Sequence, residues 1–228
     1  NFLKKKNYDT TYKDLLLAAG HLNSKSGNFS VKKWIGECKK IEKKLNLENR
    51  SKTLEIGCGS GALLKYFKKK TIIYGVDYSS ELLSLARKAI PDGNFICTEA
   101  KNINFKKNYF DNIILYSCIQ YFNNINYFNS VLKKITKSLK KGGILFIGEI
   151  VDKDLLKEFK KYRIKKIGSI KYKKLYYGKN KNLTHFCLSK KQVEKIVTKN
   201  FENIKISNSI KRGNEDNFYR FNLSCTKK

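Results

Sequence analysis

The chain has 228 residues, 41% of them hydrophobic, which fits one generous domain with a sizeable core and leaves little room for two. Lysine and arginine number 49 against 19 acidic residues, a formal net charge of +30 that favours an anionic partner such as nucleic acid, a membrane surface or an anionic substrate. Only five of the basic residues are arginine, whose planar guanidinium group suits phosphate best. The alternative interpretation of the charge is therefore that the lysines simply lie on solvated faces of the protein.

The same sequence gives no sign of a membrane span, a signal peptide or a metal site. No apolar run reaches membrane-spanning length, and the basic start leads into polar sequence. The six cysteines are scattered and form no Cys-x-x-Cys pair, so neither zinc nor a disulfide framework is expected. A reducing cytoplasm is the simplest location.

The first fifty residues are polar and indicate helices. An apolar run at 15–19 is followed by a Ser/Asn/Gly break near 24–30. From 31 to 45, apolar residues then recur at spacings of three and four, which is typical of one buried helix face.

From residue 52 onward, short apolar runs alternate with amphipathic helical stretches. The pattern predicts strands at 53–56, 71–76, 94–97, 110–117 and 144–150. It predicts helices at 61–69, 80–90 and 124–140, the last ended by Gly142-Gly143. This alternation indicates a parallel sheet with helices on both faces.

The C-terminal third is less regular. Residues 151–184 are basic and rich in tyrosine, and their pattern predicts no clear order. Ser189, with Gln192 three residues later, predicts a capped helix over 189–200. Runs at 201–207 and 218–225 then follow without a helix between them, so they are more easily antiparallel. We therefore expect a Rossmann-like, doubly wound α/β fold whose mostly parallel seven-stranded sheet has an antiparallel closing strand.

A glycine-rich turn follows the first predicted strand. Gly57, Gly59 and Gly61 stand between that strand and a helix, an arrangement that lets a backbone approach a nucleotide closely. Asp77 ends the next strand, about 20 residues on, where a carboxylate can accept hydrogen bonds from ribose hydroxyls. A dinucleotide dehydrogenase is the alternative, but its third glycine would fall at Ala62.

Further along, acidic residues follow the third strand and open the fourth. Taken in order, the motifs resemble those of the class I S-adenosylmethionine-dependent methyltransferase family, small-molecule type, over about residues 50–150. The ordered set is Glu55-x-Gly57-x-Gly59-x-Gly61, Asp77, Glu99-Ala100, Phe110-Asp111 and Leu139-Lys140-Lys141-Gly142-Gly143. The resemblance implies that the cofactor is S-adenosylmethionine.

The same resemblance implies which residues bind the cofactor. Its methionine part would lie against the glycines, with Ser117 nearby, and Glu55 would hold its amino group. Asp77 would bind the ribose and Tyr78 would border the adenine. Glu99 stands where the family usually has an aspartate that accepts from the adenine amino group. The full predicted set is Glu55, Gly57, Cys58, Gly59, Gly61, Asp77, Tyr78, Glu99, Ala100 and Ser117.

The resemblance also suggests how a single domain, 1–228, is organised. Residues 1–50 would form an N-terminal helical lid, to which Tyr8, Asp9 and Tyr12 could belong. Residues 51–150 would form the cofactor-binding core, 151–188 a basic insert on the substrate side, and 189–228 the closing helix and strands.

Methyl transfer from a sulfonium is an in-line displacement in which the protein chiefly aligns the acceptor. His185, in a loop expected near the carboxyl ends of the strands, is a candidate base or acceptor-positioning group, with a solvated histidine as the alternative. Tyr121 is a second candidate, against simple core packing, and Glu149 a third. Gln120 stands where many relatives carry a histidine or aromatic residue, so no histidine base is expected there.

The acceptor is predicted to be a small, anionic molecule. Pro91 is the only proline, which excludes the proline-containing motifs of DNA methyltransferases, and the Glu149 region lacks the double glutamate of protein arginine methyltransferases. Between 157 and 181, ten lysines and Arg163 face one acid, Glu158, with four tyrosines interleaved. We expect a phosphorylated or phosphoramidate sugar, for example in surface polysaccharide biosynthesis. RNA bound by these basic and aromatic residues is the alternative.

Overall fold

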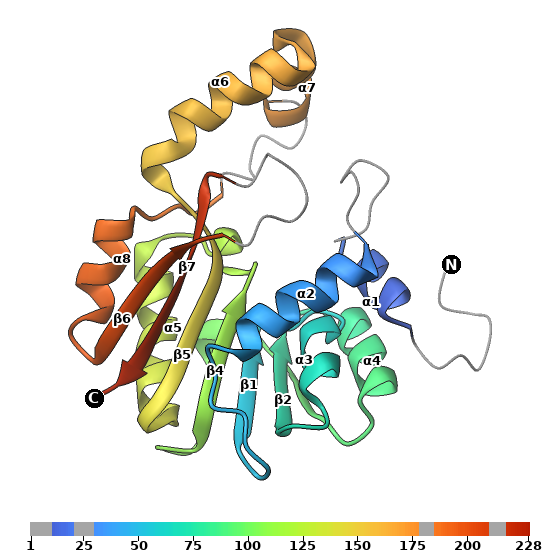
Figure 1. Cartoon of the computed structure of the whole chain (residues 1–228), viewed down its shortest axis with the longest axis vertical. Helices are drawn as coiled ribbons and strands as arrows, with labels where there is room; N and C mark the ends of the chain where they lie inside the picture. Colours follow the sequence, from blue (N-terminus) through green and yellow to red (C-terminus); the bar gives the residue numbers. More distant parts are fainter. Residues whose placement is uncertain (1–10, 21–29, 178–184, 210–217) are drawn as a thin grey trace.

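The computed structural model describes residues 11–20, 30–177, 185–209 and 218–228 (Figure 1). Its centre is a seven-stranded sheet of order β3-β2-β1-β4-β5-β7-β6. The strands are β1 (Lys52–Ile56), β2 (Ile72–Asp77), β3 (Asn94–Cys97), β4 (Phe110–Tyr116), β5 (Leu139–Val151), β6 (Phe201–Asn208) and β7 (Arg220–Lys227). β7 runs antiparallel to both β5 and β6, and the other neighbouring pairs are parallel. The predicted fold class is confirmed.

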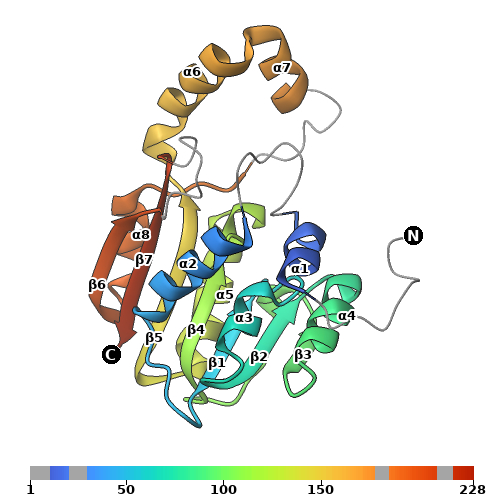
Figure 2. The same ribbon diagram turned by 45° about the vertical axis from the view of Figure 1, so that its right-hand side comes forward.

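Helices cover both faces of the sheet (Figure 2). One face packs against α1 (Tyr12–Ala18), α2 (Val31–Glu42), α3 (Ala62–Phe67) and α4 (Ser80–Ala89), and the other against α5 (Ile125–Ser138) and α8 (Lys190–Val197). The side chains of β4 illustrate the two faces, because successive side chains of a strand point to opposite sides of the sheet. Ile113 and Leu115 enter the core under α5 and α8, whereas Ile114 and Tyr116 enter the core under α2 and α3.

Helix and strand boundaries follow the predicted ones closely, with one clear error. The helix expected over 124–140 ends at Ser138, and β5 begins at Leu139 rather than at 144. Leu139 is fully buried and pairs with Phe110 of β4, so it already belongs to the sheet. The two glycines at 142 and 143 therefore lie inside the strand instead of ending the helix.

The basic insert, for which the sequence pattern predicts no clear secondary structure, forms two helices. α6 (Leu156–Ile167) and α7 (Ser169–Tyr177) meet at Gly168 and stand away from the sheet (Figures 1 and 2). Their base is held by aromatic contacts, with the Phe159 ring stacked on that of Tyr219 at 3.8 Å between centroids. After the insert, the predicted capping box of α8 is confirmed, because Ser189 and Gln192 exchange side-chain and backbone hydrogen bonds. Within the described ranges, no helix is long and apolar enough to cross a membrane.

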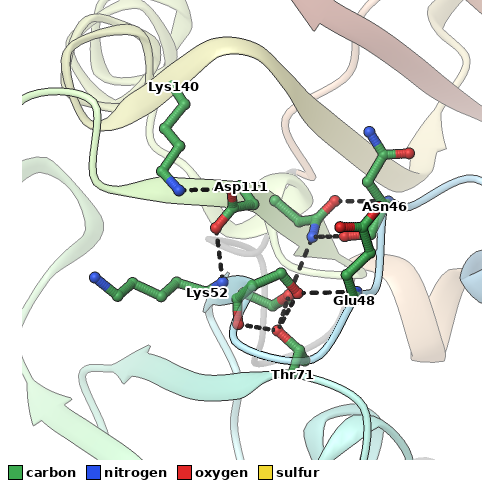
Figure 3. Close-up of polar contacts among 9 residues, drawn as sticks. Asn46, Glu48, Lys52, Thr71, Asp111 and Lys140 are labelled. Atoms are coloured by element: carbon green, nitrogen blue, oxygen red, sulfur yellow. Dashed lines mark hydrogen bonds and ion pairs between the residues drawn. The ribbon is translucent and has the colours of Figure 1, made fainter.

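A polar network at the amino ends of the strands fixes the link between α2 and β1 (Figure 3). The fully buried Asn112 of β4 donates from Nδ2 to the Asn46 carbonyl at 2.9 Å and to Thr53 Oγ1 at 3.3 Å, and accepts from the Asn46 amide at 3.0 Å. Beside it, Asp111 accepts from the Lys52 amide at 2.8 Å and from Lys140 Nζ at 2.7 Å. Asp111 thus ties β1 and β5 to β4.

We expect Asn112→Ala to lower the free energy of unfolding by about 1–3 kcal/mol, because it removes three hydrogen bonds from a buried position. Urea denaturation followed by circular dichroism measures this. Asn49→Ala, at an exposed residue beside the same network, is the control and should stay within about 0.5 kcal/mol of wild type. Equal stability of the two variants would contradict this role of Asn112.

Candidate functional site

A cavity of about 520 Å³ lies at the carboxyl ends of β1, β2 and β4. The strand order reverses between β1 and β4, and open α/β sheets bind ligands at such a switch point. Nine of the ten residues predicted to bind the cofactor line this carboxyl-edge cavity: Glu55, Gly57, Cys58, Gly59, Asp77, Tyr78, Glu99, Ala100 and Ser117. The structure therefore brings the separated sequence motifs to one place.

The glycine turn forms the floor of the cavity. Gly57 has a φ of +75°, and a Cβ there would lie 2.6 Å from the Cβ of Cys118, so no larger residue fits. Its amide donates to the Val76 carbonyl at 2.7 Å, which holds the turn against the end of β2. The thiol of Cys58 is buried, and burial raises its pKa, so it stays neutral. Gly61 does not line the cavity but caps α3, packed against Ala86 of α4.

The Asp77 carboxylate joins this turn to the next one. One oxygen accepts from the Gly59 amide at 2.7 Å and the other from the Ser79 amide at 3.0 Å. Each carboxylate oxygen has two lone pairs, so both oxygens keep one for a ligand. The carboxylate is thus fixed in orientation and still able to accept further hydrogen bonds.

Glu55 is the most unusual group in the cavity wall. It is almost fully buried, and its Oε2 atom has no hydrogen-bond partner in the described structure. Burial, with the nearby charge of Asp77 acting in the same direction, raises the pKa of Glu55 well above its usual value. A buried, unsatisfied carboxyl group of this kind suits a ligand that brings a positive charge and hydrogen-bond donors.

A more exposed part of the cavity wall begins at the end of β2. Tyr78 is 79% exposed, although it is a large aromatic residue. Glu99 forms an ion pair with Lys101 at 3.1 Å between Nζ and Oε2, and both side chains are about half exposed. Exposed ion pairs are worth little, so Glu99 can exchange this partner for a ligand.

The cavity wall after β4 holds Ser117, predicted to lie near the cofactor, and Tyr121, predicted to lie on the acceptor side. Ser117 has a φ of +54°, a strained conformation that is common at functional sites. The buried Gln120 donates from Nε2 to the Ser117 carbonyl at 2.8 Å, while its Oε1 has no partner in the described structure. Tyr121 lines the cavity, and its ring meets that of His185 edge-on, 5.9 Å away.

His185 itself does not line the cavity and stands behind Tyr121 at the rim. The Phe186 amide donates to the Gln120 carbonyl at 2.9 Å, which attaches this segment to the residues after β4. Partial burial, with the charge of Arg220 adding to it, lowers the pKa of His185. The imidazole is therefore neutral at pH 7.

Arg220 was missed by the sequence reasoning. It lines the cavity and donates from Nη1 to the Glu149 carbonyl at 2.9 Å. Glu149, named from the sequence as a candidate, also lines the cavity and has a φ of +63° in an irregular part of β5. Because β7 is antiparallel, its first residue lies beside the last residues of β5, at the edge where the parallel strands end. In the sequence, the only feature that sets Arg220 apart is that it is one of five arginines.

The N-terminal helices close one side of the cavity. Ser60 of the glycine turn donates to the Leu15 carbonyl of α1 at 2.7 Å, and Ala19 and Gly20 line the cavity. Trp34 of α2 donates to the Ala62 carbonyl at 3.3 Å. Of the residues named for a lid, Tyr12 lies in α1, while Tyr8 and Asp9 lie outside the described residues.

Within the basic insert, the helices α6 and α7 contribute no described residue to the lining of the cavity. Residues 178–184, the end of the basic stretch, lie outside the described ranges. Over the part of the chain that the structure describes, no three His, Cys, Asp or Glu side chains form a metal-binding group.

Comparison with known proteins agrees with this site. Residues 54–147 match the family model described as a methyltransferase domain. A demethylmenaquinone methyltransferase of Thermotoga maritima is 33% identical over 106 residues, so the match covers 45% of this chain and less than half (45%) of that relative. Residues 54–147 are thus similar to methyltransferase domains, over less than half of the chain.

Solved structures show the same fold. An S-adenosylmethionine-dependent methyltransferase of Thermotoga maritima has a TM-score of 0.60 and 22% identity, over 86% of this chain and 89% of that one. The N-methyltransferase NodS of Bradyrhizobium japonicum, in complex with S-adenosyl-L-homocysteine, has a TM-score of 0.64 and 13% identity, over 95% and 97% of the two chains. At these identities the likeness concerns the fold alone.

S-adenosylmethionine, the cofactor that the sequence motifs imply, fits the cavity. The volume is within the range of about 300–1,000 Å³ that small-molecule sites have. The orphaned Oε2 of Glu55 suits a positively charged amino group, and the Asp77 carboxylate can accept from a diol. The donor and acceptor set therefore matches the two polar parts of this cofactor.

We expect Glu55→Gln to change how the stability of the ligand-free protein depends on pH. A raised folded-state pKa means that the stability contribution of Glu55 is complete below its usual value of 4.5 and is lost as pH rises through the raised value. The melting temperature of wild type should therefore fall relative to that of Glu55→Gln between pH 5 and pH 8.

Differential scanning fluorimetry at the two pH values measures this change. Glu48→Gln, at an exposed residue, is the matched control. Its melting temperature should differ from that of wild type by the same amount at both pH values. An offset for Glu55→Gln that does not change with pH would show that the buried carboxyl group is not protonated on folding.

Proposed function

We propose that this chain is an S-adenosylmethionine-dependent methyltransferase that acts on a small, anionic metabolite, such as a phosphorylated or phosphoramidate sugar. The observation that supports the acceptor class is the guanidinium group of Arg220, which lines the cavity together with residues that follow β4. Arginine offers a planar fork of donors that matches phosphate and carboxylate groups.

In this proposal each polar part of the cofactor has a residue to hold it. Glu55 binds the amino group, the backbone from Gly57 to Gly59 borders the methionine part with Ser117, and Asp77 accepts from the ribose hydroxyls. Tyr78 covers the adenine, and Glu99 beside Ala100 accepts from its amino group. Gly61 does not contact the cofactor in this proposal but caps the start of α3, which follows the glycine turn. When bound, the cofactor would supply a methyl group already activated on a sulfonium.

The residues on the acceptor side then orient the second substrate and handle its proton. Arg220 holds the anionic group, and the free Oε1 of Gln120 accepts a hydrogen bond from a hydroxyl or amine. Tyr121 and the neutral His185 stand at the rim, where His185 can accept a proton directly or through water. An acceptor that is already an anion at the reacting atom would need no such base.

An RNA acceptor is the alternative, and the geometry of the basic residues speaks against it. Among the described side chains of α6 and α7, no aromatic residue or lysine lines the cavity, so these side chains do not form a binding track that leads into it. Single-stranded RNA is usually held by such a track of cations and stacking rings.

The proposal predicts turnover on anionic small molecules. Release of S-adenosylhomocysteine would be measured across a panel of phosphorylated sugars, nucleotides and phosphoramidates, their neutral counterparts, and RNA. We expect turnover with members of the anionic group and at least about tenfold less with the matching neutral compounds, because Arg220 binds the charge. Robust activity on RNA with none on any metabolite would refute the proposal.

The same assay tests Arg220 directly. Arg220→Gln should raise KM for the active anion about tenfold to hundredfold and leave KM for the cofactor nearly unchanged. Arg50→Gln removes the same charge from an exposed residue at the far edge of the sheet and should change neither value. An Arg220→Gln enzyme with unchanged KM for its acceptor would remove the support for an anionic substrate.

A further inference from the structure

The helix pair α6–α7 concentrates positive charge on a projecting part of the molecule (Figures 1 and 2). Residues 156–177 contain eight lysines and Arg163 against a single acid, Glu158. Glu158 lies in the first turn of α6, at the base of the pair, so the far end carries no acidic residue. None of these residues lines the carboxyl-edge cavity, so the catalytic site does not explain their charge.

The far end of this pair also exposes an apolar side chain. α6 ends at Ile167 and α7 begins at Ser169, with Gly168 between them at a φ of +80°. Ile170 is 84% exposed, more than any other large hydrophobic residue in the described part of the chain. Around it stand the exposed lysines of the tip: Lys165, Lys166, Lys171, Lys173 and Lys174.

These tip lysines are available to a partner. Lys166 donates to the hydroxyl group of Tyr162 on its own helix. Lys165, Lys171 and Lys173 are exposed and take part in none of the ion pairs found among the described residues. Exposed lysines beside an apolar tip are complementary to a surface that has negative charge outside and hydrocarbon beneath.

We propose that this tip docks onto an anionic phospholipid surface, with Ile170 entering the headgroup region and the surrounding lysines contacting lipid phosphates. Each lysine near an anionic membrane strengthens binding, and an apolar side chain adds to this when it leaves water. The site needs neither the cofactor nor an acceptor, so it is independent of the proposed reaction.

Two tyrosines of the pair, Tyr162 and Tyr172, favour a membrane over RNA. RNA binding by a basic surface relies on aromatic rings on which bases stack. Tyr172 is buried, and the Tyr162 ring packs edge-on against that of Phe218, 5.6 Å away. These two rings are used within the protein, and the exposed Ile170 is aliphatic.

The test is co-sedimentation of the full chain with vesicles of phosphatidylcholine alone or of phosphatidylcholine with phosphatidylglycerol. We expect binding to the anionic vesicles only, weakened as salt is raised. Ile170→Asp should lower the partition coefficient about tenfold, and replacing Lys165, Lys171, Lys173 and Lys174 by alanine should lower it more.

Matched controls lie at the opposite edge of the sheet. Ile72→Asp alters another exposed isoleucine, and alanine at Lys68, Lys69, Lys106 and Lys107 removes the same charge. Both controls should bind nearly as well as wild type, and melting temperatures confirm that every variant is folded. The proposal is overturned if the chain does not bind anionic vesicles or if the controls lose as much binding as the tip variants. It is also overturned if Ile170→Asp binds vesicles like wild type while the tip lysines are needed for binding an RNA oligonucleotide.

Discussion

The rest of the site depends on the two hydrogen bonds that the Asp77 carboxylate accepts, from the amides of Gly59 and Ser79. These amides belong to the turns that follow β1 and β2, so one side chain sets the distance between two loops at the same edge of the sheet. The glycine turn keeps its shape because Gly57 has no Cβ to collide with Cys118. The cavity floor is therefore determined by backbone groups and one carboxylate, whose oxygens each keep a lone pair for a polar ligand.

The remaining walls come from distant parts of the chain that reach this edge for separate reasons. α1 reaches it through the bond from Ser60 to the Leu15 carbonyl, and α2 through the indole of Trp34. β7 reaches it because an antiparallel strand begins where its parallel neighbours end, and this places Arg220 beside Glu149. The side proposed for the cofactor is thus built around the turns after β1 and β2, and the side proposed for the acceptor from residues far apart in the sequence. On this proposal, acceptor specificity can change on the second side without disturbing the first.

This division explains what the sequence could predict. The strand–glycine–helix pattern and Asp77 are local signals, and nine of the ten predicted cofactor residues do line the cavity. Arg220 could not be placed, because its position depends on the pairing of β7 with β5. The start of β5 was misplaced because Gly142-Gly143 is typical of a helix end, whereas Leu139 is already buried against β4. α6 was not predicted because it buries no residue fully, so its sequence lacks a strong apolar face.

The most direct test of the central claim is the calorimetric titration of S-adenosylhomocysteine into the full chain and into its Asp77→Asn variant. Asparagine keeps one accepting oxygen and puts a donor in place of the other, so it loses one amide bond and the charge that attracts a diol. We expect one site per chain in wild type and affinity at least about tenfold weaker in Asp77→Asn, while the exposed control Asp92→Asn binds as wild type does. Wild-type affinity in Asp77→Asn, or no binding to the wild-type chain, would contradict the account.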